Sequence, residues 1–322
     1  MDTRTLSGTD LQTSPLVMGT MTFGSQVEAP EAKEMVDVCL DAGVTFFDTA
    51  NAYNAGRSEE ILGESLAGRR DEALIATKVF NPMGDGPDDA GLGHRAITKA
   101  LDASLERLRT DRVDLYYLHQ PDPQVPIEES MGALEELRAS GKIRYWATSN
   151  YAAWQIADMY RRSDRHGWQC PAIAQQMYNP IARRLDDEYA AFAAAYDLST
   201  IAYNPLAGGL LTGKHQRDGA PQARSRFTLD MYRDRYWNDA QFDAVERLGE
   251  IAGSAHLTLI ELSFRWLLTR PLVDAVLIGA SNLQQLQSNL DACSDDPLDA
   301  EVLDACDAVW GTLQGAAPKY NR

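Results

Sequence analysis

Eight short runs of β-prone residues alternate with stretches of helical periodicity along most of this 322-residue chain. This alternation constrains the fold strongly, because successive parallel strands have to be joined by right-handed crossover connections. A count of eight favours closure of the sheet into a single (β/α)8 TIM barrel over an open sheet. The strands are expected at residues 15–19, 44–48, 73–78, 113–119, 143–149, 172–175, 199–203 and 275–279.

Glycines and turn residues mark the ends of these elements. Gly43 and Gly141 each follow a helical stretch and precede a strand, as a left-handed helix C-cap requires. Residues 4–16 carry a Ser-Gly-Thr-Asp turn between short β-prone runs and are expected to form a β-hairpin that closes the N-terminal mouth, or bottom, of the barrel. One barrel domain over residues 1–322 then accounts for the whole chain.

Two connections are long and rich in glycine, residues 80–94 and 208–238, and we expect them to be irregular loops with a functional or mobile role. The first contains Gly91-Leu92-Gly93-His94-Arg95-Ala96, which matches the G-x-G-x-x-A pattern of a dinucleotide-binding turn. A Pro/Asp/Gly loop precedes this match where the Rossmann motif requires a strand, so we do not expect a Rossmann site.

Charge and composition exclude several classes of partner. The chain has 30 basic and 47 acidic residues and a formal net charge of −17, which repels nucleic-acid phosphates and anionic lipids. Four scattered cysteines without a C-x-x-C pair are interpreted as reduced thiols. We find neither an apolar leader nor a run of about 18 apolar residues, and therefore expect a cytoplasmic protein that does not bind membranes.

Four ionisable residues lie at or just beyond the predicted strand ends, where the active site of a barrel enzyme is found. Asp48 ends the second strand and Tyr53 follows five residues later, while Lys78 and His119 end the third and fourth strands. Burying these charges is costly unless they pair with one another or with a ligand. We therefore expect the four side chains, called the tetrad below, to meet.

The tetrad suggests an acid catalyst. An ammonium about 4 Å from a phenol is worth roughly 4 kcal/mol at an effective dielectric near 20, so Lys78 is expected to lower the pKa of Tyr53. Asp48 would keep Lys78 charged, and His119 could donate a hydrogen bond to a carbonyl oxygen. Taken singly, these residues have structural interpretations as a helix cap, a salt-bridge partner, a packing aromatic and a hydrogen-bonded histidine.

Residues 45–53 (TFFDTANAY), 58–63 (SEEILG), 76–78 (ATK) and 114–119 (DLYYLH) together resemble the signatures of the aldo-keto reductases. The resemblance covers nearly the whole chain and is to the branch that contains potassium-channel β-subunit-like and bacterial members. It implies a (β/α)8 barrel, a nicotinamide cofactor bound extended at the C-terminal mouth, and a catalytic tetrad of Asp48, Tyr53, Lys78 and His119.

The same resemblance implies the cofactor site. Ser149, Asn150 and Gln175 are assigned to the nicotinamide carboxamide, for which amide side chains supply both donor and acceptor. Tyr203 is expected to stack on the nicotinamide ring. The predicted cofactor-binding residues are Gly19, Thr20, Met21, Asp48, Ser149, Asn150, Gln175, Tyr203, Asn204, Pro205, Leu206, Gly208, Gly209, Lys214, Arg226, Gly279, Ser281, Gln285 and Asn289.

Three features of this set carry chemistry. Gly208 and Gly209 would let backbone N–H groups approach a pyrophosphate, although they could equally be ordinary turn residues. Asn204 stands where many relatives carry serine, so its contact is open. Ser281 stands where many members place arginine or lysine, but members with serine also bind the phosphorylated dinucleotide, so NADPH is favoured and NADH is possible.

The predicted activity is NADPH-dependent reduction of a carbonyl, in an aldehyde, ketone or keto-sugar, with Tyr53 as proton donor. The predicted substrate-binding residues are Met21, Phe23, Tyr53, Phe80, His119, Tyr151 and Trp237. One alternative is a regulatory subunit that binds NADPH with negligible turnover. Another is a metal-dependent barrel hydrolase or isomerase, but among strand-end residues only His119 and Asp48 suit a metal, so none is expected.

Overall fold

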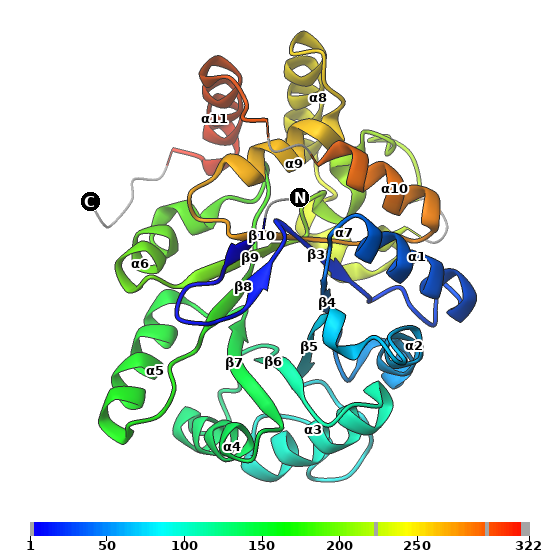
Figure 1. Ribbon diagram of the computed structural model, residues 1–322. Coiled ribbons are helices and arrows are strands. Elements are labelled where there is room, and N and C mark those ends of the chain that lie inside the picture. The colour runs from blue at the N-terminus through cyan, green and yellow to red at the C-terminus, as the bar shows by residue number, and fades with distance from the viewer. Residues whose placement is uncertain (1–2, 222–224, 294–295, 317–322) are drawn as a thin grey trace.

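The computed structural model describes residues 3–221, 225–293 and 296–316, and it contains a closed barrel of eight parallel strands (Figure 1). Around the barrel the order is β10-β3-β4-β5-β6-β7-β8-β9, which confirms the predicted (β/α)8 fold. The predicted strand ends differ from the observed ones by at most two residues. The strands are β3 (Leu16–Gly19), β4 (Phe46–Asp48), β5 (Leu74–Val79), β6 (Val113–Leu118), β7 (Ile143–Ser149), β8 (Ile173–Met177), β9 (Ser199–Tyr203) and β10 (Ala275–Ile278).

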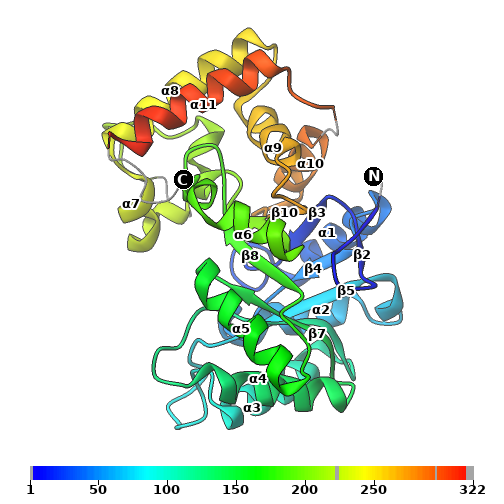
Figure 2. The same cartoon turned by 90° about the vertical axis from the view of Figure 1, so that its left-hand side faces the viewer.

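Most of the helices surround the strands as an outer ring (Figure 1). The helices are α1 (Ala29–Asp41), α2 (Arg57–Ser65), α3 (His94–Leu108), α4 (Ile127–Ala139), α5 (Ala153–His166), α6 (Tyr189–Tyr196), α7 (Asp230–Tyr236), α8 (Asp239–Ser254), α9 (Leu259–Thr269), α10 (Leu283–Ala292) and α11 (Ala300–Gln314). Helices α8 and α11 lie side by side on one flank (Figure 2). Over the described ranges, no helix combines the length and apolarity needed to cross a bilayer.

The N-terminal hairpin covers the end of the barrel at which the strands begin. Its strands, β1 (Arg4–Thr5) and β2 (Gln12–Thr13), pair antiparallel. The backbone N–H of Ser7 donates to Oγ of Ser199, at the start of β9, over 2.8 Å. Leu6 and Leu11 are buried in a cluster with side chains of the barrel strands. The predicted closure of the bottom by this hairpin is confirmed.

Local sequence explains how helices pass into strands. Gly43 and Gly141 have φ values of 82° and 77°, the left-handed conformation that glycine adopts without steric penalty, and both end a helix as predicted. Helix α3 buries Ile97, Leu101 and Leu108, which recur at helical spacing on the face toward the barrel. Burial of that face holds α3 against the sheet.

The two long connections differ. The segment before α3 is a loop without a strand leading into Gly91, which agrees with rejection of a Rossmann turn. Residues 208–238 are more regular than expected, because they include α7 and a 3₁₀ turn at Arg226–Thr228. Phe227 and Trp237 pack edge to face with ring centroids 4.9 Å apart and hold this segment down. Residues 222–224 of the segment lie outside the described ranges.

Candidate active site

The four tetrad residues meet at the C-terminal end of the barrel, as predicted. Lys78 Nζ is hydrogen-bonded to Asp48 Oδ1 and lies 3.4 Å from the hydroxyl oxygen of Tyr53. The rings of Tyr53 and His119 are 5.9 Å apart in an edge-on arrangement. Asp48 ends β4, Lys78 lies near the end of β5, and His119 follows β6, so three neighbouring strands position these groups.

The Lys78 ammonium is held by three acceptors in the interior. Besides Asp48 and Tyr53, it donates to the backbone carbonyl of Thr49 over 2.7 Å. Lys78 is fully buried and Asp48 is 1 % exposed. Gln175 donates to the second carboxylate oxygen of Asp48 over 2.9 Å from β8, which lies across the barrel. Each charged atom therefore has a partner, as a buried ion pair requires.

Burial and charge act in opposite directions on the tetrad. Burial raises the pKa of Tyr53 above its usual value, because desolvation and Asp48 together outweigh the Lys78 ammonium. The expected lowering of this pKa is therefore wrong. Burial alone would lower the pKa of Lys78, but Asp48 and Tyr53 reverse this and raise it. At neutral pH the site thus holds a protonated phenol beside an ammonium.

The His119 side chain is uncharged at neutral pH. Desolvation, assisted by Lys78, lowers its pKa from 6.5 to about 3. Its Nδ1 atom lies 3.5 Å from the side-chain nitrogen of Asn81, and its backbone N–H donates to the carbonyl of Val79 over 3.0 Å. A neutral imidazole can donate one hydrogen bond to a carbonyl oxygen, which is the role expected for His119.

Sequence reasoning missed two groups in this cluster. The Thr49 carbonyl is a backbone acceptor, so no choice of side chain reveals it. Asn81 follows Lys78 by three residues, just beyond the end of β5, and this position among the strand-end residues was the available signal. Gln175 was expected at a carboxamide, and the structure joins its side-chain nitrogen to Asp48.

Beside the tetrad, Asn150 and Tyr203 form one hydrogen-bonded unit with His119. The Tyr203 hydroxyl donates to Oδ1 of Asn150 over 2.7 Å, and the Asn150 amide donates to the His119 carbonyl over 2.9 Å and to Ser149 Oγ over 3.0 Å. Asn150 has a φ of 65°, a left-handed conformation that asparagine tolerates better than most residues. The structure therefore brings together Ser149, Asn150 and Tyr203, which are all predicted cofactor residues.

In the loop after β9, backbone N–H groups donate hydrogen bonds to other atoms of the same loop. The N–H of Gly208 donates to the Asn204 side chain over 2.7 Å, and the N–H of Gly209 donates to the Leu206 carbonyl over 2.8 Å. The turn therefore uses both of these N–H groups, and the approach of backbone N–H groups of this loop to a pyrophosphate stays a prediction. The Asn204 side chain holds this turn in place, since it accepts from Gly208 and its amide also donates to the Tyr236 hydroxyl over 2.8 Å.

Cationic side chains of the same segment are available for an anion. Neither Lys214 nor Arg226 forms an ion pair with any residue that the structure describes. Arg226 donates to the Tyr232 hydroxyl over 2.7 Å and contacts Met21 Sδ at 3.2 Å. It also lies next to Gly279, since a Cβ placed there would be 3.7 Å from its guanidinium. Arg226 thus joins the loop to the ends of β3 and β10.

Other predicted cofactor residues pack against or hydrogen-bond to groups of the protein itself. A Cβ at Gly19 would lie 2.6 Å from Leu277 Cδ2 of β10, so that the leucine side chain would have to shift. Thr20 contacts the Asp48 carbonyl through its hydroxyl over 3.2 Å, which supports the end of β4. Pro205 is buried, and Leu206 packs against the core. These residues shape the rim of the mouth through packing.

The predicted adenosine side lies at the start of α10. The backbone N–H and hydroxyl of Ser281 both donate to Oε1 of Gln285, over 3.0 and 2.8 Å. Asn289 donates to the carbonyl of Gly279 over 3.1 Å. The predicted residues are therefore linked to one another. Glu31 accepts the backbone N–H of Leu283 over 2.9 Å, so a carboxylate already occupies one donor of this helix N-terminus.

The predicted substrate residues fall into two groups. Met21 and Phe80 are partly exposed. Phe23 is fully buried, the Tyr151 hydroxyl donates to the Gln120 carbonyl over 3.2 Å, and Trp237 packs in the aromatic cluster of the loop. Packing explains the positions of these last three, and their contact with a substrate stays a prediction.

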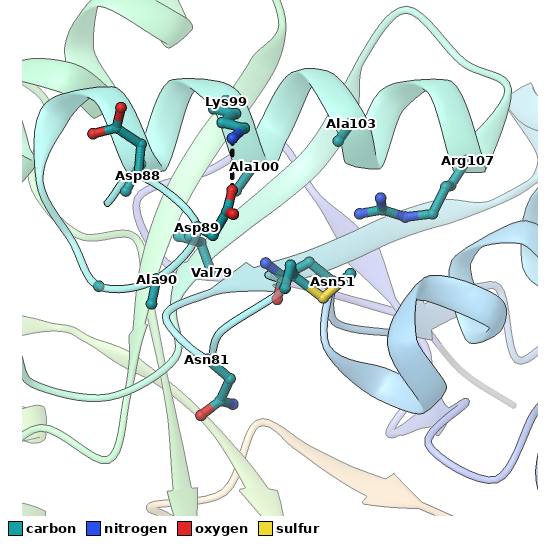
Figure 3. Close-up of a pocket in the computed structure, with 13 residues that line it drawn as sticks. Asn51, Val79, Asn81, Asp88, Asp89, Ala90, Lys99, Ala100, Ala103 and Arg107 are labelled. Atoms are coloured by element: carbon teal, nitrogen blue, oxygen red, sulfur yellow. Dashed lines mark hydrogen bonds and ion pairs between the residues drawn. The ribbon is translucent and has the colours of Figure 1, made fainter. Parts of the chain in front are cut away.

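A separate hollow lies beside β5, against α3 (Figure 3). Asn51 and Asn81 line it on the strand side, and an ion pair between Lys99 and Asp89 closes part of its rim. The Oδ1 atom of Asn51 is buried there without a hydrogen-bond partner among the described residues. Asn81 links this hollow to the tetrad through its contact with His119.

The described residues offer no ligand set for a metal ion. Across residues 3–221, 225–293 and 296–316, no group of three or more His, Cys, Asp or Glu side chains is arranged to hold one. The ionisable groups at the barrel mouth are instead paired as proton donors and counter-charges. The arrangement suits proton transfer to an oxygen atom that gains negative charge.

Comparison with known proteins gives the family. The family model described as "Aldo/keto reductase family" matches residues 15–311. A probable voltage-gated potassium channel subunit beta of Oryza sativa subsp. japonica is 36% identical, over 96% of this chain and 96% of that protein. Human aldo-keto reductase family 7 member A3 is 34% identical over 95% and 96%. Human aflatoxin B1 aldehyde reductase member 2 is 35% identical over 95% and 89%. The chain therefore belongs to the aldo/keto reductase family of NAD(P)H-dependent oxidoreductases.

Proposed function

We propose that this protein reduces the carbonyl group of an aldehyde, a ketone or a keto-sugar to an alcohol with NADPH, and that Tyr53 donates the proton. The observation that carries the proposal is the position of the Tyr53 hydroxyl 3.4 Å from the fully buried Lys78 ammonium. A phenol in this position can lose its proton to an adjacent oxygen, because the ammonium stabilises the phenolate that remains.

The donor set fits a nicotinamide dinucleotide. Lys214 and Arg226 could bind its phosphates, and Asn150, held by Tyr203, could bind the carboxamide. Arg226 also has hydrogen bonds to Tyr232 and Met21 that hold it at the mouth. When bound in its reduced form, the nicotinamide supplies a hydride to the carbonyl carbon. NADPH is proposed over NADH from the family resemblance at Ser281.

The residues of the chain complete the reaction. As the carbonyl carbon accepts a hydride, the electron pair of the C=O bond moves to oxygen, and Tyr53 transfers its hydroxyl proton to that oxygen. Neutral His119 donates a hydrogen bond to the same oxygen and orients it. Asp48 holds Lys78 in its charged form, and Lys78 stabilises the phenolate of Tyr53 until solvent restores the proton.

The test is a Tyr53→Phe variant, which keeps the ring and removes the proton. We expect NADPH binding close to that of the wild type and a fall in carbonyl-dependent NADPH oxidation of at least about 100-fold, since a positioned acid contributes 10²–10⁴ in rate. Tyr145→Phe is the matched control, because its hydroxyl contacts Asp10 of the hairpin region at the other end of the barrel. Full activity in Tyr53→Phe would exclude the assigned role.

A second candidate is a regulatory subunit that binds NADPH and turns over negligibly. One relative is named as a probable potassium channel subunit beta, which favours this alternative. A relative named as an aldehyde reductase and the paired tetrad favour catalysis. A panel of aldehydes, ketones and keto-sugars, assayed with NADPH and with NADH, separates the two functions. Tight NADPH binding without turnover on any carbonyl would support the regulatory subunit.

A further inference from the structure

His215 is a buried histidine in the cofactor-side loop that the tetrad does not use. It is 9 % exposed and packs edge-on against Phe227 and Trp237, with ring centroids 4.9 and 5.5 Å apart. Its Nε2 atom is buried and has no hydrogen-bond partner among the described residues. Since a buried polar atom without a partner is costly, this nitrogen is a candidate for contact with a ligand.

Gly209 lies next to this nitrogen. A Cβ added at Gly209 would be in van der Waals contact with His215 Nε2 at 3.6 Å and with Lys214 Cε at 3.9 Å. Gly209 has a φ of 105°, which other residues rarely adopt, so residue 209 places no side chain between these groups. The imidazole and the lysine side chain therefore both lie beside Gly209.

Two cations of this region have no counter-charge among the described residues. Lys214 on the same segment and Arg226 on the neighbouring 3₁₀ turn lack ion-pair partners within the described part of the chain. The acidic side chains Asp239, Asp243 and Glu246 of α8 all pair with Arg217. Phe227 and Trp237, which pack edge-on against the His215 ring, carry no charge. The unpaired side chains of Lys214 and Arg226 therefore favour an anion here.

Two backbone donors of this loop are already used. The N–H groups of Gly208 and Gly209 donate within the turn. A diphosphate at this loop would therefore also draw on side-chain donors, and the Nε2 atom of His215 has no partner among the described residues. Desolvation and the Lys214 ammonium lower the pKa of His215, so its ring is neutral at neutral pH. An adjacent dianion acts in the opposite direction and favours protonation.

We propose that His215 donates a hydrogen bond from Nε2 to the pyrophosphate of the bound dinucleotide and takes up a proton as the dinucleotide binds. This inference rests on the proposed NADPH-dependent function. It makes cofactor affinity dependent on pH through a residue outside the tetrad. Binding tightens as pH falls from about 8 to about 6, because the bound state holds one proton more on His215.

The experiment is isothermal titration of wild type and His215→Phe with NADPH at pH 6.5 and pH 8.0, in buffers of different ionisation enthalpy. We expect His215→Phe to lose about tenfold in affinity at pH 6.5 and less at pH 8.0, since the variant lacks the side-chain hydrogen bond to the charged pyrophosphate. On binding NADPH at pH 6.5, the wild type should take up several tenths of a proton more than the variant. The 2′-phosphate of NADPH titrates in both experiments, so its proton uptake cancels when the variant is subtracted from the wild type.

Two controls make the result specific. Phenylalanine fills the same aromatic cluster and removes the unpartnered nitrogen, so the unfolding temperature of His215→Phe should equal or exceed that of the wild type. His256→Asn removes an exposed-turn histidine whose φ of 57° asparagine tolerates, and should bind NADPH like the wild type. Equal affinities and equal proton uptake in wild type and His215→Phe would overturn the role of His215. A folded wild type that binds no NADPH would overturn the proposed function itself.

Discussion

At the scale of single residues, the site depends on one buried ion pair. Lys78 and Asp48 are almost completely excluded from water, and their other polar contacts come from Thr49, Tyr53 and Gln175. Such a pair is weak evidence for stability, because desolvation offsets the attraction, but losing one partner leaves an isolated buried charge. The pair therefore acts as a unit.

The Asp48→Asn variant tests this unit. It should lower the free energy of unfolding by about 3–5 kcal/mol, because the Lys78 ammonium loses its counter-charge. Adding Lys78→Met to Asp48→Asn should restore at least about half of the loss, since no buried charge then remains. Urea unfolding measures both, and Glu60→Gln in the exposed pair with Arg57 is the control, expected to change stability by less than about 1 kcal/mol. A double variant less stable than Asp48→Asn would contradict the coupling of the two charges.

At the scale of elements, a close approach between α2 and α3 positions the segment after β4 that carries Tyr53. A Cβ at Gly63 of α2 would lie 2.6 Å from the carbonyl oxygen of Leu108 at the end of α3. The obstacle is backbone, which cannot rotate away. Glu59 of α2 is buried and pairs with Arg107 of α3, so packing and charge fix the same contact. The two helices thereby fix one wall of the barrel.

Gly63→Ala should therefore destabilise the protein by about 2 kcal/mol, because overpacking outweighs the gain in helix propensity. The matched control is Gly249→Ala in α8, where an added Cβ would meet nothing within 4 Å. The control should stabilise by up to about 1 kcal/mol, since alanine is the better helix former. Thermal unfolding measures the stability of both variants. A Gly63→Ala protein as stable as the Gly249→Ala protein would show that α2 and α3 can move apart without a loss of stability.

At the scale of the whole molecule, burial of His119 makes folding sensitive to acid. Its pKa is about 3 in the folded protein and 6.5 when exposed, so the unfolded chain binds the extra proton between these values. This contribution to stability is complete above pH 6.5 and is lost as pH falls toward 3, by up to about 1.4 kcal/mol per pH unit.

A His119→Asn variant cannot take up that proton. Its free energy of unfolding should therefore fall less steeply than that of the wild type between pH 6.5 and pH 4, although the carboxylates titrate in both proteins. Urea unfolding at half-unit steps of pH gives the two slopes. Parallel slopes would show that His119 does not have the low pKa described here.

Much of the fold could be predicted from the amino-acid sequence, because strand and helix periods are local properties. β7 and β9 have the predicted bounds, and the turns at Gly43 and Gly141 follow from backbone sterics. The approach of Asp48, Tyr53, Lys78 and His119 was also predicted, since the ends of parallel strands meet at one rim. Helix α7 was missed, because its short sequence lies in a segment whose glycines and arginines favoured a loop.

The eightfold βα alternation can be read from local sequence, and with it the side of the barrel on which the ionisable residues gather. Three features depend on the folded arrangement: Gln175 binds Asp48, burial raises the pKa of Tyr53, and the N–H groups of the loop glycines are used within their own turn. Periodicity acts over a few neighbouring residues, whereas desolvation and hydrogen-bond partners depend on groups such as Asp48 and Gln175, which lie 127 residues apart and meet only when the barrel closes.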